Sequence, residues 1–114
     1  MPRIKTALLH SPPYAVAESL RRLGANLRTA RIARNLTQAQ AAEKIGTGTR
    51  VIAEAERGRP GTGIAVYLAL LWAYDLLDSV AQLADPASDL VGLAAGARRK
   101  RSHAPSPALI DNEF

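Results

Sequence analysis

Four neighbouring side chains near the middle of the chain carry chemical groups that recognise nucleotide bases. The guanidinium of Arg50 can donate two hydrogen bonds to O6 and N7 of guanine, and the carboxylate of Glu54 can accept one from N4 of cytosine. Thr49 can hydrogen-bond to several base edges, and Val51 offers methyl groups to thymine unless it faces the core. Thr49, Arg50 and Glu54 would share the exposed side of a helix. The spacing therefore predicts contacts with DNA bases.

Residues that could hold a phosphate lie around the same stretch. Gln38 stands at the expected first position of a helix, where the positive end of the helix dipole favours a phosphate. Arg28 lies on a basic helix face. This face could simply be exposed to solvent or could contact phosphates, and the sequence favours neither alternative. Its other members are Arg21, Arg22 and Arg34.

The distribution of charge agrees with a nucleic-acid surface in the first half of the chain. Residues 1–60 carry eleven Lys and Arg against four Asp and Glu, whereas residues 61–97 carry four Asp and no Lys or Arg. Residues 98–114 add four basic and two acidic residues, and the chain has a net charge of +5. We expect the basic half to face a polyanion and the acidic half to face elsewhere.

The residue types that catalysis would need are missing or scattered. The chain has no Cys, and its two His, His10 and His103, lie in expected terminal arms. No Ser–His–Asp set, metal-ligand cluster or phosphate-cradling glycine loop stands out, so we expect no enzyme activity, catalytic residue, metal, cofactor or small-molecule substrate. No apolar run approaches the roughly 20 residues that span a bilayer, so no membrane association is expected. A chain without Cys suits a reducing cytoplasm.

Residues 36–58 are predicted to form two short helices joined by a tight turn. The Thr37 hydroxyl can cap the first helix, and Gly46 can end it in the left-handed conformation that other residues disfavour. The second helix would close at Gly58. The inward faces are expected to carry Ala41, Ala42, Ile45, Val51, Ile52 and Ala55. Such a unit is a helix-turn-helix, which places its second helix in the major groove of DNA.

Two longer apolar patterns flank this unit. One helix is expected over about residues 12–34, with Gly24 as a candidate bend, and another over residues 64–77. The second is apolar on all sides, and the rest of the chain is too small to bury it, so we expect a homodimer. Its interface is predicted to contain Tyr67, Leu68, Leu71 and Trp72. Shorter helices are expected over residues 78–84 and 89–97.

The chain is expected to contain one domain between two arms. Residues 1–10 are predicted to be a loose N-terminal arm, and residues 11–97 to be the DNA-binding and dimerisation domain. Residues 98–114 are predicted to be a basic, disordered tail. The end of this tail is more apolar than is usual for a solvent-exposed segment. It could dock on a protein partner through Leu109, Ile110 and Phe114. Whether the tail contacts DNA, a protein or nothing stays open.

The motifs L-T-Q at 36–38, A-x-x-I-G at 42–46 and I-x-x-x-E-x-G at 52–58 resemble the Cro/C1-type (XRE) family of DNA-binding proteins. The resemblance implies an all-α fold: a five- to six-helix domain of the lambda repressor-like type, with flexible N- and C-terminal arms. The sequence departs from the family pattern at Gly48, where Ser or Thr usually caps the recognition helix, and at Ala41, where Leu is usual.

The same resemblance implies roles for four charged residues. Arg31 would form an ion pair with Glu56 and so tie the first long helix to the recognition helix. Arg57 and Arg59 would lie where family members contact the phosphate backbone.

A narrower resemblance extends over about residues 10–96. The segments HSPPYAV, GTGTR, GIAVYLALLWAYDLLD and LADPASDLVGLA are similar to HipB-type antitoxins. This resemblance implies a dimeric repressor that binds a palindromic operator, restrains a HipA-like Ser/Thr kinase toxin and represses its own operon. The alternatives are a stand-alone XRE-type repressor without a toxin partner, and an adaptor that does not bind DNA.

Overall fold

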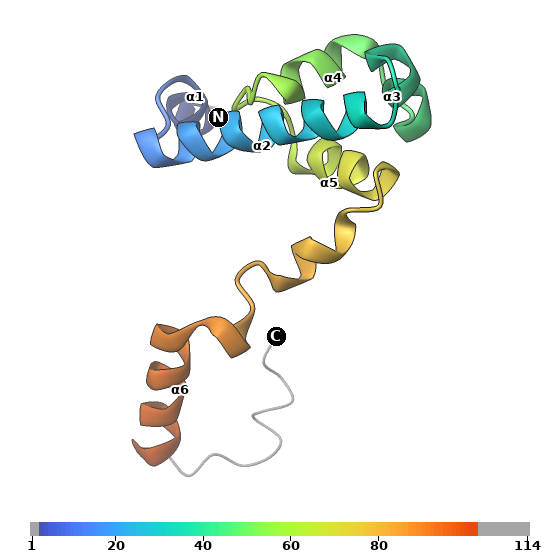
Figure 1. The fold of residues 1–114 in the computed structure, drawn as a ribbon. Helices are drawn as coiled ribbons and strands as arrows, with labels where there is room; N and C mark the ends of the chain where they lie inside the picture. Colours follow the sequence, from blue (N-terminus) through green and yellow to red (C-terminus); the bar gives the residue numbers. More distant parts are fainter. Residues whose placement is uncertain (1–2, 103–114) are drawn as a thin grey trace. The chain divides into compact units, whose positions relative to one another are not determined.

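The computed structural model describes residues 3–102, and within them the chain is entirely helical. The α-helices are α1 (Arg3–His10), α2 (Tyr14–Ala33), α3 (Gln38–Ile45), α4 (Thr49–Glu56), α5 (Ile64–Ala73) and α6 (Leu90–Ser102) (Figure 1). Two 3-10 helices, η1 (Leu77–Gln82) and η2 (Pro86–Ser88), lie between α5 and α6 in the sequence. The predicted all-α fold is therefore confirmed.

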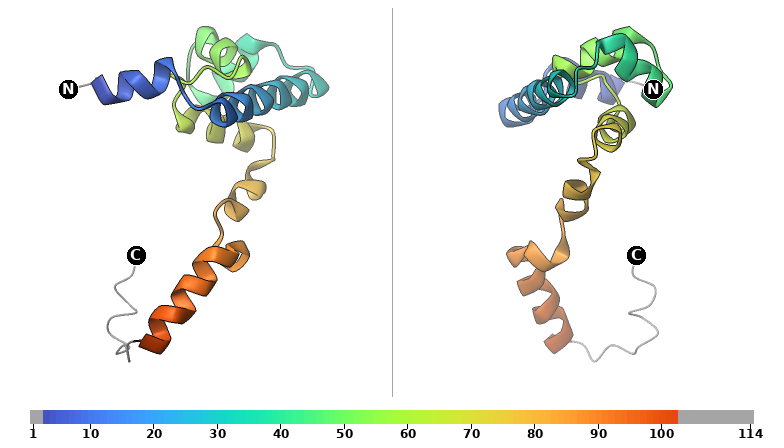
Figure 2. Two further views of the ribbon diagram at one scale, coloured as in Figure 1. Left: turned by 90° about the vertical axis from the view of Figure 1, so that its left-hand side faces the viewer. Right: turned by 45° about the vertical axis from the view of Figure 1, so that its right-hand side comes forward.

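The chain divides into two compact units, residues 1–80 and residues 81–114. In the first unit α4 packs against α2, α3 and α5, and α3 also packs against α5. Figure 2 shows from two further sides that these four helices lie together. The second unit contains η2 and α6, which contact each other.

The sequence signals around the turn between α3 and α4 are realised in the backbone. Thr37 and Gln40 form a capping box, in which the Thr37 hydroxyl accepts from the Gln40 N–H and the Gln40 side chain accepts from the Thr37 N–H. Gly46 ends α3 in the left-handed region with φ 79°, and Asn35 takes the same region before α3 with φ 58°. Gly48 precedes α4 without a side-chain cap, so α4 begins with less support than α3.

Two glycines allow α2 and the end of α4 to approach closely. A Cβ atom at Gly24 would lie 2.5 Å from the Ala55 carbonyl oxygen, and one at Gly58 would lie 2.5 Å from the Leu20 carbonyl oxygen. Gly58 also has a positive φ of 70°. Gly24 lies inside α2, and this close contact with α4 is a role that the sequence did not indicate.

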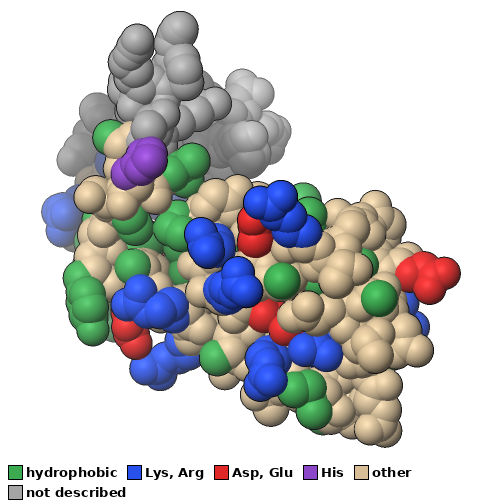
Figure 3. All heavy atoms as spheres, turned by 90° about the horizontal axis from the view of Figure 1, so that it is seen from above, with side chains coloured by type: hydrophobic (Ala, Val, Ile, Leu, Met, Phe, Trp, Pro, Cys, Tyr) green, Lys and Arg blue, Asp and Glu red, His purple; other side chains and the backbone are tan. Residues whose placement is uncertain are grey.

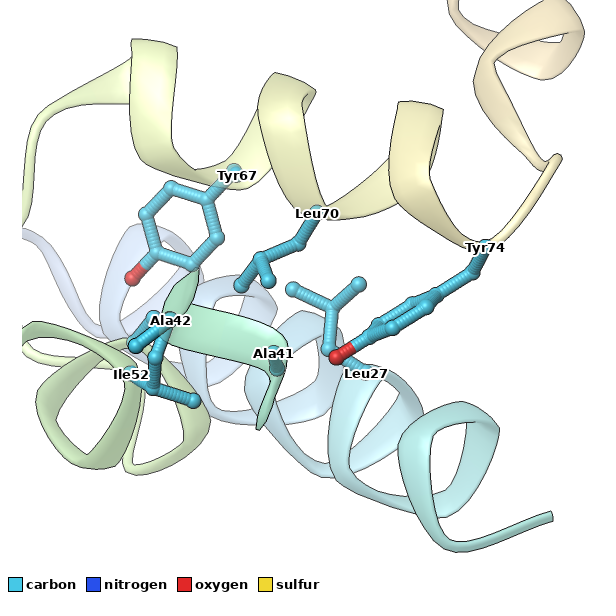
Figure 4. Close-up of a cluster of buried hydrophobic side chains, with 8 residues drawn as sticks. Leu27, Ala41, Ala42, Ile52, Tyr67, Leu70 and Tyr74 are labelled. Atoms are coloured by element: carbon cyan, nitrogen blue, oxygen red, sulfur yellow. The ribbon is translucent and has the colours of Figure 1, made fainter. Parts of the chain in front are cut away.

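The core of the first unit joins α2, α3, α4 and α5. Its largest fully buried side chains are Leu27, Ile52, Tyr67, Leu70 and Tyr74. Tyr67, Leu70 and Tyr74 project from one side of α5 into this cluster, which also contains Ala41 and Ala42 (Figure 4). The predicted interface role of Tyr67 is wrong, because its side chain is 2 % exposed within a single chain.

The segment after α5 differs from the expectation of a helix through residue 77. α5 ends at Ala73, because Asp75 takes a left-handed φ of 61° that no α-helix can continue. Residues 77–82 form a 3-10 helix where an α-helix over 78–84 was expected, and Ala84 also has a positive φ of 57°.

The two ends of the described chain are more helical than expected. Residues 3–10 form α1 instead of a loose arm. The last helix, expected over residues 89–97, continues to Ser102 and so includes the start of the predicted disordered tail. No described helix is long and apolar enough to cross a membrane.

Candidate nucleic-acid interface

The exposed side of α4 carries the residues predicted to contact bases. Thr49 and Arg50 are exposed, and Val51 and Glu54 are half-buried. The Arg50 side chain is 90 % exposed, and its Nε lies 3.5 Å from Oε2 of Glu54. A pair this exposed contributes little to stability. Arg50 and Glu54 can therefore break their ion pair and bind base edges instead, at a small cost in free energy.

A buried ion pair fixes the end of α4 to α2. Nε of Arg31 donates to Oε2 of Glu56 at 2.6 Å, and its Nη2 donates to Oε1 at 3.1 Å. Nη1 of Arg31 donates to the Leu36 carbonyl at 2.8 Å. Both charged residues are 8 % exposed. The hydrogen bonds to Glu56 raise the pKa of the Arg31 guanidinium against the opposing effect of burial, so the guanidinium remains charged.

Gln38 joins this pair, which the sequence did not indicate. Its Nε2 donates to Oε1 of Glu56 at 3.1 Å. The side-chain amide has a second N–H that this bond does not use. Gln38 therefore links the buried carboxylate to the first turn of α3, where a phosphate was predicted.

The arginines of α2 have different surroundings. Arg28 is exposed. Arg21 pairs with Glu18 at 2.8 Å, which together with the nearby positive charges lowers the pKa of that carboxyl group. Arg34 has a structural contact instead: its Nη2 donates to the Tyr74 carbonyl at 2.8 Å, and its guanidinium lies 5.6 Å from the centre of the Tyr74 ring. Arg34 therefore caps the end of α5.

Basic side chains gather on one face of the first unit. Figure 3 shows Lys and Arg side chains grouped on the face seen from above, where Figure 1 places α3 and α4. Arg57 and Arg59, predicted to contact phosphates, are exposed in the loop after α4. The base-contact and phosphate-contact candidates therefore come from α2, α3, α4 and the loop that follows α4.

The outer side of α5 presents an apolar ridge, which we define as Ile64, Leu68, Trp72 and Leu76. Ile64 is 69 % exposed, Trp72 is 59 % exposed and Leu76 is 40 % exposed, and Leu68 is half-buried. The residues are four positions apart, so those within α5 line one side of the helix. Leu71, another predicted interface residue, packs against the core.

The remaining predicted sites are not brought into a cluster. Among residues 3–102, no group of His, Cys, Asp and Glu could hold a metal ion. The predicted docking residues Leu109, Ile110 and Phe114 lie outside the described residues.

Comparison with known proteins agrees with this geometry. Residues 22–84, more than half of the chain, match a family model described as a helix-turn-helix domain. No curated protein and no solved structure gives a significant match. Domains of this family bind DNA and are typically not enzymes. The chain therefore belongs to the helix-turn-helix family, in its Cro/C1-like (XRE) form.

Proposed function

We propose that the protein is a sequence-specific transcriptional repressor that binds a palindromic operator as a homodimer and has no catalytic activity. The observation that carries this proposal is the contrast between the two sides of α4. Its inner side is held by the buried Arg31–Glu56 pair, and its outer side presents Thr49 and Arg50 to solvent. A rigidly held helix with free polar groups is suited to base recognition in the major groove.

Backbone contacts would orient this helix on DNA. Gln38 can donate its second amide hydrogen to a phosphate while it remains bonded to Glu56. Arg28, Arg57 and Arg59 are exposed and would supply further phosphate contacts, which fix orientation without specifying sequence. Arg50 and Glu54, with Thr49 and Val51, would specify the bases.

Dimerisation through the α5 ridge would explain why α5 is apolar on both sides. The inner side is used in the core through Tyr67, Leu70 and Tyr74, while Trp72 stays 59 % exposed on the ridge. An isologous contact between two ridges would bury these side chains around a two-fold axis. Two recognition helices would then meet half-sites about 34 Å apart on one side of the duplex.

The narrower proposal is that this repressor is the antitoxin of a HipA-like Ser/Thr kinase and represses its own operon. It rests on the HipB-like segments and on an acidic surface of the first unit, where Asp75 and Asp78 are exposed. DNA would repel such a surface, which leaves it available to a protein while the basic side stays on the operator. Residues 11–97 would form the DNA-binding and dimerisation domain. A stand-alone repressor is the alternative if the kinase does not bind.

The test is a binding titration with an operator and its single-base variants. Arg50→Ala should relax discrimination at one position in each half-site, where a lost bidentate base contact costs about 1–3 kcal/mol. Arg57→Ala is the matched control and should weaken binding to every variant alike, because a phosphate contact carries no sequence information. An equal loss on every variant for Arg50→Ala would show that Arg50 contacts phosphate.

The adaptor alternative has its own outcome in this titration. If the unmodified protein bound no duplex at low salt, the repressor proposal would be wrong and the fold would serve only to hold a protein.

A further inference from the structure

The helix α1 has little support within its own chain. It contains eight residues, and helices shorter than about 12–15 residues are marginal in water unless they pack on another surface. α1 does not pack extensively against any described helix of its chain, and the left view of Figure 2 shows it extending away from the other helices of the first unit. Leu8 is 56 % exposed and Leu9 is 44 % exposed. These two apolar side chains are therefore left largely without cover.

The first half of α2 carries an apolar groove that is also uncovered. We define the α2 groove as Ala15, Val16, Ser19, Leu20 and Leu23, which line one depression in the surface. Val16 is 44 % exposed, whereas Leu20 and Leu23 are half-buried because they also pack against the core. From residue 15 to residue 23 the groove extends about 12 Å along α2, which is about the length of α1. The groove can therefore accept a helix of the size of α1.

The connector between α1 and α2 keeps these two surfaces of one chain apart. It consists of Ser11, Pro12 and Pro13. Ser11 and Pro12 each precede a proline, which disfavours the helical backbone conformation, and Pro13 is extended with ψ 147°. No residue of the connector has the positive φ that helps a chain to reverse its direction. A connector this short and this restricted does not fold α1 back over the α2 groove of its own chain.

We propose that the α2 groove of one copy is covered by α1 of a second copy, in a reciprocal exchange between two chains. Each copy carries one uncovered helix and one uncovered groove of matching length, so a two-fold pair of chains satisfies both surfaces at once. Exchange of an identical element is a low-cost route to a dimer, because no other protein is needed. The groove contains none of the ridge residues and none of the candidate DNA contacts, so this inference does not rest on the proposed function.

The experiment measures disulfide formation between two chains, which is free of background because the protein contains no Cys. A full chain with Leu9→Cys is mixed with a full chain with Ser19→Cys at micromolar concentration, and the mixed disulfide is identified by its mass. The matched control replaces Ser19→Cys by Ala25→Cys, because Ala25 is exposed but lies on another side of α2. Contact between α1 and the groove raises the local thiol concentration, so the mixed disulfide should form at least about tenfold faster than in the control. Circular dichroism should show the same helix content in all variants.

A longer connector tests the role of the prolines. A flexible Gly-Ser-Gly-Ser insertion after Ser11 should let α1 reach the groove of its own chain. A single chain with Leu9→Cys/Ser19→Cys and this insertion should then form its disulfide within the chain. The same double variant without the insertion should form disulfides between chains.

Several results would overturn the inference. A mixed disulfide that forms no faster than the control would do so, because α1 would then not lie in the groove. An intrachain disulfide in the double variant without the insertion would also do so, since α1 would then cover its own groove. Adding Trp72→Ala should leave the crosslinking rate unchanged, and loss of crosslinking would mean that two chains meet only at the ridge. Failure of the protein to bind any duplex would instead refute the proposed function and leave this contact intact.

Discussion

The buried Arg31–Glu56 pair provides the most demanding test of how α4 is held. Glu56→Ala would leave the Arg31 guanidinium, with a side chain only 10 % exposed, bonded to the Leu36 carbonyl alone. The substitution would also remove the carboxylate oxygen that accepts a hydrogen bond from Nε2 of Gln38. Removing one partner of such a pair costs about 3–5 kcal/mol, because a buried charge is left without compensation.

The expected signature is non-additivity in a double-mutant cycle. Arg31→Ala should cost as much as Glu56→Ala, since it would isolate a carboxylate whose side chain is 4 % exposed. The double variant removes both charges, so its loss should be well below the sum, with a coupling energy of about 3 kcal/mol. Urea denaturation at low temperature, followed by circular dichroism, measures each free energy of unfolding.

A domain of this size has only about 5–10 kcal/mol of stability, so the alanine variants approach the limit of folding. Glu56→Gln is the milder second variant, because its amide oxygen keeps one acceptor for Arg31 while the amide NH2 replaces the other carboxylate oxygen. The exposed Glu18–Arg21 pair, with side chains 45 % and 54 % exposed, is the matched control and should show no measurable coupling. Additive losses for Arg31 and Glu56 would refute the reasoning.

Three other perturbations test the fold and the dimer. Gly24→Ala should lower the free energy of unfolding by about 1–3 kcal/mol, because the added Cβ would meet backbone atoms of α4. Gly96→Ala is the control, because a Cβ at Gly96 would meet open space. Equal urea midpoints for the Gly24→Ala variant and the unmodified chain would contradict the close crossing. Burial raises the pKa of Tyr67 and of Tyr74 above 10.0, so their phenols ionise first in the unfolded chain. This contribution to stability should be complete below pH 10 and should be lost as the pH rises further. Urea titrations from pH 8 to 11 measure the loss, and a decline that persists in Tyr67→Phe/Tyr74→Phe would contradict this cause. Trp72→Ala should raise the dimer dissociation constant about 30-fold or more, as expected when an aromatic anchor worth about 2 kcal/mol is lost; sedimentation of the unmodified chain as a monomer at micromolar concentration would rule out the ridge.

Local signals in the sequence were enough to predict the helix-turn-helix. Thr37 and Gly46 act through their own backbone neighbourhoods, so their roles as cap and left-handed residue follow from residue type alone. The all-α fold follows from the helical spacing of apolar residues in α2 and from this turn.

Contacts between distant segments could not be predicted in the same way. The all-round apolar character of α5 did not show which side enters the core, so Tyr67 was placed at the interface although it is buried. Arg34 resembles any other arginine of a basic face, and only the fold brings it to the Tyr74 carbonyl. The bond from Gln38 to Glu56 likewise depends on the crossing of helices 18 positions apart in sequence.

Residues 98–102, the described start of the predicted tail, form the end of α6. Four consecutive basic residues suggested disorder, yet they lie in a helix whose C-terminal dipole favours cations.

Selection of sites from a pool of randomised duplex DNA by the full-length protein tests the central claim most directly. The account predicts enrichment of a palindrome whose half-site centres are about 10–10.5 base pairs apart, and loss of preference at one position per half-site with Arg50→Ala. Recovery of a pool without any enriched sequence, by a protein that is folded and dimeric, would contradict the claim that α4 recognises bases.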